Sequence, residues 1–126
     1  MDTLYHILPI VAAVLFLSAA VAAVHRPTVN WVLPAITSLM FLTWSAHAII
    51  VGGQTGFWVE HTRNAWGNQI WFDLLIGVAI AWTLLVPRAK AVGMRPWPWL
   101  ALVAATGGIG LTAMVARCRY LESRAI

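Results

Sequence analysis

The sequence predicts an all-α polytopic membrane protein, a bundle of four transmembrane helices with a short interfacial segment between the second and the third. Of the 126 residues, 61% are hydrophobic and only 10% are charged, and the mean hydropathy is +0.81. Soluble domains carry about 25% charged residues. A helix that spans a bilayer needs about 20 mostly apolar residues, and the apolar runs leave room for four such helices. We therefore expect a single membrane domain, residues 1–126.

The first transmembrane helix is predicted over residues 5–24, an apolar run in which alanines make the helix slim enough for close approach by a neighbour. The alternative is a secretory signal peptide, because Ala-Val-Ala-Ala shortly before His25 could serve as a small-residue cleavage site. Asp2 and the lack of Lys or Arg before the run disfavour that alternative.

The second helix is predicted over residues 31–51, with Asn30 as its N-cap and two glycines after its end. Residues 54–67 mix aromatic and charged side chains and are too polar to span. That composition is typical of a short helix that lies at the membrane surface.

The third helix is predicted over residues 68–86, where Pro87 ends it, because proline lacks the N–H that a helix interior needs. The fourth is predicted over residues 97–116, opened by Pro96 and followed by a polar tail, residues 117–126.

The predicted fourth helix carries a stripe of small residues. They recur at every fourth position: Ala104, Gly108, Thr112 and Ala116. Small residues at this spacing let membrane helices pack closely. We therefore expect a homo- or hetero-oligomer that associates through the Gly108 and Thr112 stripe and through the first helix.

The positive charge of the chain points to the membrane rather than to nucleic acid. The formal charge is +4 and the pI is about 10.3, but the basic residues cluster just outside the apolar runs. That placement sets topology and contacts lipid headgroups. With four spans the Lys and Arg residues divide equally between the two sides. Because early segments usually dominate orientation, we place loop 87–96 in the cytoplasm and both termini outside, in a bacterial inner membrane.

Several kinds of chemistry find no support in the sequence. Cys118 is the only cysteine, so an internal disulfide and a Cys-x-x-Cys site are excluded. The four histidines are not spaced as helical metal-ligand pairs, and we predict no metal site. A Gly-rich phosphate loop and a nucleophile elbow are also lacking from the sequence.

The candidate catalytic residues are Asp73 and His47. A carboxylate in hydrocarbon costs about 2.5 to 3.5 kcal/mol on insertion scales, so Asp73 needs a partner, a proton or a polar cavity. Both residues fall near the same predicted connection, and therefore on the same side of the midplane. Gln69 and Thr112 come to a similar depth. The pair could be an acid–base site, or it could simply hold two helices together.

Other residues are candidates for lining a ligand pocket. His61, Asn64 and Asn68 lie nearer the water on the same side, and the deeper Trp44 and Trp82 could line an apolar or pigment ligand. Helix packing explains the two tryptophans equally well.

The region from Asn64 to Trp97 resembles a known family. Asp73-Leu74-Leu75-Ile76, followed by Arg88-x-Lys90-x-x-Gly93-Met94, is similar to small bacterial membrane proteins grouped as the domain of unknown function DUF2834. Asp73 to Gly77 and the late glycine-rich helix also look like membrane proteins related to the plant neoxanthin-synthesis factor ABA4. The first resemblance implies helices and no activity, and the second implies an involvement with carotenoids. Neither supplies catalytic residues.

The sequence favours a binding or assembly role: an accessory subunit of a membrane complex, a holder of a lipid, quinone or carotenoid, or both. The alternative is a membrane-embedded acid–base isomerase or cyclase for an isoprenoid-like substrate, with Asp73 and His47 transferring protons. A proton-coupled carrier would use the same residues.

Overall fold

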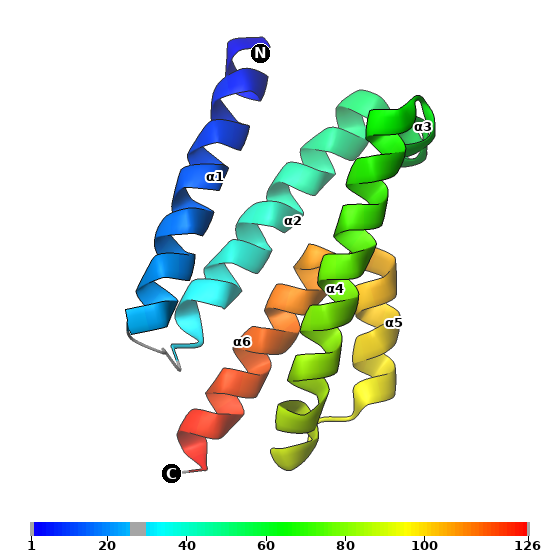
Figure 1. Cartoon of the computed structure of the whole chain (residues 1–126). Helices are drawn as coiled ribbons and strands as arrows, with labels where there is room; N and C mark the ends of the chain where they lie inside the picture. The colour runs from blue at the N-terminus through cyan, green and yellow to red at the C-terminus, as the bar shows by residue number, and fades with distance from the viewer. Residues whose placement is uncertain (1, 26–29, 126) are drawn as a thin grey trace.

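The computed structural model describes residues 2–25 and 30–125, and every regular element in these ranges is an α-helix. Three helices are long and apolar enough to cross a membrane: α1 (Asp2–His25), α2 (Val32–Gly52) and α4 (Ala65–Ala91). The predicted all-α class is confirmed, but the described chain has three candidate spans rather than four. Figure 1 shows α1, α2 and α4 running along the length of the molecule.

The N-cap of α2 is Trp31 rather than the predicted Asn30, whereas its other end lies at the predicted glycines. The Asn30 side-chain oxygen accepts a hydrogen bond from the Val32 N–H at 2.9 Å, which satisfies one of the free donors at the start of the helix. At the other end Gly53 adopts a φ of 83°, and its N–H donates to the Ile49 carbonyl at 2.8 Å. Glycine reaches this left-handed region without strain, so α2 stops there.

The segment predicted to lie at the membrane surface contains a short helix, α3 (Gly56–Thr62). The chain then reverses into α4, whose N-cap is Asn64: its side-chain oxygen accepts a hydrogen bond from the Gly67 N–H at 2.8 Å. A Cβ at Gly67 would overlap the Glu60 carbonyl, so the close crossing of α3 and α4 requires glycine at this position.

The prediction that Pro87 ends the third span is wrong, because α4 continues through it to Ala91. Packing explains the extension. Ala89 is fully buried against α6 (Gly108–Arg124), and Arg88 forms an ion pair with Glu122 of that helix at 2.6 Å. These contacts offset the hydrogen bond that proline removes from the last turns.

The predicted fourth span, 97–116, is instead a helical hairpin. α5 (Pro96–Thr106) runs up beside α4, and α6 turns back toward the end where α5 began (Figure 1). At 1.5 Å per residue, the 11 residues of α5 cover about 16 Å, roughly half of a bilayer's hydrocarbon core. The hairpin is therefore too short to cross.

The break in the hairpin has a local cause that average hydropathy does not detect. Gly107 has a φ of 62°, a value that non-glycine residues rarely adopt. The Thr106 hydroxyl donates to the Leu102 carbonyl at 2.7 Å and accepts from the Gly110 N–H at 2.9 Å. Thr106 thus ends one helix and caps the next.

The core of the molecule lies at the lower end of Figure 1, where α4 and α6 meet. Its buried residues are Leu85, Ala89, Met94, Met114 and Cys118. The tip of the hairpin is fixed to the middle of α2, because the Ser38 hydroxyl donates to the Ile109 carbonyl at 2.8 Å.

The small-residue stripe is divided between α5, where Ala104 is exposed, and α6, where Gly108 packs against α2. A Cβ at Gly108 would lie 3.2 Å from the Phe41 ring, and Ala116 is buried. The Thr112 hydroxyl donates to the Gly108 carbonyl at 2.7 Å. Gly108 and Ala116 therefore pack within the chain, whereas Ala104 remains exposed.

The hairpin also changes where the chain ends. The expected placement of both termini on one side depended on a fourth span. Figure 1 instead shows the start of α1 and the end of α6 at opposite ends of the molecule, with the end of α6 at the same end as the loop that joins α4 to α5.

Candidate functional site

A groove lies above the tip of the hairpin. It has a volume of about 880 Å³ and lies between the second half of α2, α3 and the hairpin tip. Leu42 and Ile49 of α2 and Ile109 of α6 supply apolar wall. The groove exists because the hairpin stops halfway, so the space beyond its tip is left unfilled.

One end of the groove is polar. Gln54, Thr55 and Glu60, on and before α3, line it there, and Ser45 adds a hydroxyl from α2. Glu60 is the charged residue of the lining, and its carboxylate is paired with the Arg63 guanidinium at 3.1 Å on the protein surface. The groove therefore combines an apolar floor with neutral hydrogen-bonding groups and the paired Glu60 carboxylate at its rim.

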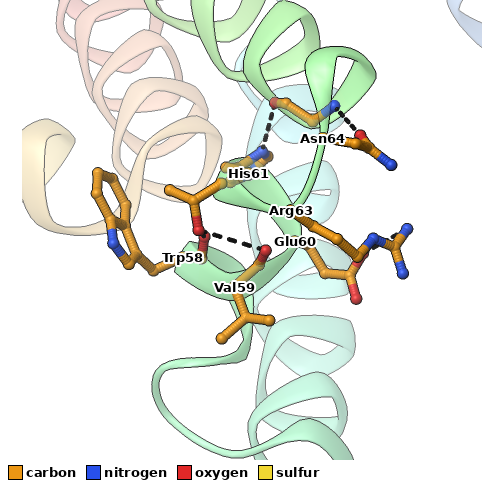
Figure 2. A network of polar contacts seen from close by, with 8 residues as sticks. Trp58, Val59, Glu60, His61, Arg63 and Asn64 are labelled. Atoms are coloured by element: carbon orange, nitrogen blue, oxygen red, sulfur yellow. Dashed lines mark hydrogen bonds and ion pairs between the residues drawn. The ribbon is translucent and has the colours of Figure 1, made fainter.

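A network at the start of α4 holds α3 in place over the groove (Figure 2). The His61 Nδ1–H donates to the Gly67 carbonyl at 3.4 Å, and the Asn68 amide donates to the His61 carbonyl at 2.7 Å. The Trp71 ring of α4 lies 5.0 Å from the His61 ring and 6.0 Å from that of Trp58. His61, Asn64 and Asn68, predicted as pocket residues, thus act in joining two helices.

The structure does not bring His47 and Asp73 together. The Tyr5 hydroxyl of α1 and the His47 Nε2 share a hydrogen bond at 3.4 Å, and the Trp44 ring lies 4.9 Å from the His47 ring. Asp73 is exposed, and it forms no hydrogen bond or ion pair with the described residues.

The direction of Asp73 explains the missing pair. The side of α4 that packs on the rest of the molecule carries Trp71, Val78, Trp82 and Leu85. At 3.6 residues per turn, Asp73 lies roughly 150° around the helix from that side. A similar depth in the membrane was therefore not enough to predict contact between His47 and Asp73, because two side chains at one depth can point in different directions.

The remaining predicted pocket residues are scattered. Gln69 is exposed on α4, and Thr112 is bonded within α6. Trp82 lines a small hollow of about 270 Å³ with Lys90 and Trp97, at the other end of the molecule from the groove. None of the predicted candidates lines the groove.

The groove residues carried a weak signal that the sequence analysis missed. The run Gly52-Gly53-Gln54-Thr55-Gly56 marks a turn, and Thr106-Gly107-Gly108 marks a second. These two turns line the groove from opposite sides, which no spacing in the sequence indicates.

The lower end of the molecule is fixed by an ion pair. The Arg88 Nε and Nη2 donate to the two Glu122 carboxylate oxygens at 3.1 and 2.6 Å. The hydrogen bond from Arg88 lowers the pKa of the Glu122 carboxyl below its ordinary value. Burial raises the pKa of the neighbouring Cys118 thiol, which disfavours the reactive thiolate form.

No protein-family model matches the chain, and neither the curated proteins nor the solved structures include a match. The resemblance to the DUF2834 and ABA4-related proteins stays a prediction.

Proposed function

We propose that this chain is a small integral membrane protein with a binding role, which holds an apolar or amphiphilic molecule in the groove above the hairpin. The groove is the observation that carries the proposal. Its volume of about 880 Å³ falls within the range of roughly 300 to 1,000 Å³ that is common for ligand sites.

The lining favours a ligand with a long apolar body and a neutral polar head. Ser45, Gln54 and Thr55 offer hydrogen bonds, whereas no Lys or Arg belongs to the lining. A phosphate headgroup would find no cation there. An isoprenoid quinone or a hydroxylated carotenoid fits this chemistry better than an anionic phospholipid.

The acid–base isomerase has less support. Its proposed proton-transfer residues, His47 and Asp73, do not line the groove and do not pair with each other. A dry pocket that positions substrate against both groups is needed for that chemistry.

We also propose an orientation. With the hairpin in place, the basic residues of the described chain that flank the core end are Arg88, Lys90, Arg95, Arg117, Arg119 and Arg124. Arg63 alone lies at the α3 end. Cytoplasmic ends carry the excess of Lys and Arg, so the core end, with loop 87–96 and the C-terminal end, faces the cytoplasm.

The binding role is tested with two tryptophan variants on one helix. Ala105 lines the groove, whereas Ala101, one turn earlier on α5, is exposed and lies outside it. We expect native mass spectrometry from mild detergent to show a bound apolar molecule with the unaltered chain and with Ala101→Trp. Ala105→Trp should lose it. Equal retention by both variants, or no bound molecule in any of them, would contradict the proposal.

A further inference from the structure

The helix α1 has almost no partner within its own chain. Its most apolar window is 0% buried, although Tyr5 contacts Trp44 and His47 of α2 near one end. His6 follows Tyr5, so its side chain points about 100° away from the contact with α2. The His6 Nδ1–H donates to the Asp2 carbonyl at 2.7 Å, and the exposed side chain keeps its Nε2 atom for a further bond.

The outward side of α1 has the pattern of a helix-packing seam. From His6 onward it advances in alternating steps of four and three residues: His6, Ile10, Ala13, Leu17, Ala20 and Val24. That spacing is the one by which two helices pack knobs into holes. Ile10, Leu17 and Val24 are each at least 60% exposed.

The outward side of α4 repeats the same spacing around Asp73. Its members are Trp66, Ile70, Asp73, Gly77, Ile80, Leu84 and Pro87. The large apolar residues on this side are each more than half exposed: Trp66, Ile70, Ile80 and Leu84. A Cβ at Gly77 would meet nothing within 4 Å, so a second helix could approach closely there.

We propose that α1 of one copy of this chain packs on α4 of a second copy, with His6 of the first bonded to Asp73 of the other. Both helices begin at the same end of the molecule, so copies in one orientation place them parallel (Figure 1). Aligning His6 with Asp73 sets Ile10 over Gly77 and Ala13 against Ile80. These two contacts each match a small side chain with a large one, and Leu17 meets Leu84 one turn further on.

The complementary chemistry of His6 and Asp73 favours a second copy of this chain as the partner of the outward side of α4. Asp73 needs a partner at its depth, and the described basic residues of its own chain lie elsewhere. His6 Nε2 donates when the ring is charged and accepts from a protonated carboxyl when it is neutral, so one shared proton makes the bond in either case. The contact joins different faces of two copies, so the assembly closes as a ring or as a dimer with two such contacts.

This association goes beyond the proposed ligand binding, and it does not depend on what occupies the groove. Two differently tagged chains test it in membranes, both carrying Cys118→Ala, one with Ile10→Cys and the other with Gly77→Cys. Oxidation should link them. Val11→Cys is the matched control, because Val11 is also exposed but lies on another side of α1. Absent linking, or equal linking through Val11, would overturn the proposal.

Exchanging His6 and Asp73 distinguishes a specific hydrogen bond between them from nonspecific apolar association of the helices. We expect His6→Asp and Asp73→His each to weaken association about tenfold, and the double variant to regain it, since interhelical hydrogen bonds in membranes have this order of strength. A double variant as weak as the single ones would overturn the His6–Asp73 contact. An Asp73-dependent complex with a different protein that carries a basic transmembrane residue would do the same.

Discussion

The Thr106 hydroxyl and the Gly110 N–H, 2.9 Å apart, form the hydrogen bond that turns the last apolar run into a hairpin. The bond works because Gly110 brings no side chain to the crossing. A Cβ there would lie 2.7 Å from the Thr106 hydroxyl oxygen and 2.9 Å from the Leu102 carbonyl oxygen.

Replacing Gly110 with alanine should therefore destabilise the protein, even though alanine is the better helix former. We expect Gly110→Ala to lower the free energy of unfolding by about 1 to 3 kcal/mol, the usual cost of overpacking. Denaturant titration in detergent micelles measures it. Gly52→Ala is the control, because a Cβ at Gly52 meets nothing within 4 Å. Equal stability of the two variants would mean that α5 and α6 do not cross so closely.

The hairpin also predicts that the two ends of the chain lie on opposite sides of the membrane. We expect a fluorescent protein fused after Ile126 to fold in the cytoplasm, and an N-terminal periplasmic reporter to be active in the same host. A continuous fourth span would instead put both ends on one side. The two fusions therefore distinguish a hairpin from a span directly.

The ion pair between Arg88 and Glu122 should make stability depend on pH. The folded-state pKa of Glu122 lies below its unfolded value, so the contribution is present at neutral pH and is lost as the pH falls through the folded-state pKa. We expect Glu122→Gln to cost about 1 kcal/mol at pH 7, in view of its two-pronged geometry. The variant and the unaltered protein should converge in acid.

A second ion pair, between Arg63 and Glu60, serves as the control for this effect. The side chains of Arg63 and Glu60 are 63% and 60% exposed. Glu60→Gln should change stability by less than about 0.5 kcal/mol at any pH, because exposed pairs contribute little. A pH-independent deficit in Glu122→Gln would show that packing, rather than charge, accounts for its loss.

The roof of the groove depends on Gly67, where α3 crosses α4. We expect Gly67→Ala to push α3 away from α4 and to lower ligand retention along with stability, since its Cβ would overlap the Glu60 carbonyl. Gly77→Ala, on the same helix but in open space, should leave the monomer in detergent unchanged or slightly more stable. Thermal melts with and without added quinone measure both effects. Unchanged melting of Gly67→Ala would contradict the close crossing.

The sequence was a good guide to three helices and a poor one to the last. Hydropathy located α1, α2 and α4, but their starts were less well predicted: α4 begins at Ala65 with Asn64 as its N-cap, rather than at residue 68. The sequence analysis did not detect the break at Gly107, because the residues on both sides of it within the predicted span are similarly apolar. A backbone turn does not change the average hydropathy. Length alone then predicted a span.

The candidate site was harder still to predict. The groove is lined by two turns about fifty residues apart in sequence, around Gly53 and Thr106, and it exists only because the hairpin stops short. The sequence singles out Asp73 by its depth, but the direction of its side chain depends on which side of α4 the hairpin covers. No single helix carries that information.

The hairpin has a consequence for how the chain enters the bilayer. Arg117, Arg119 and Glu122 lie on α6, and a continuous fourth span would have to carry all of them across the hydrocarbon during synthesis. A hairpin that begins and ends on one side moves none of them (Figure 1). The insertion machinery would therefore translocate no segment after α4. Residues 92–125 would enter the membrane afterwards, from the side on which they were synthesised.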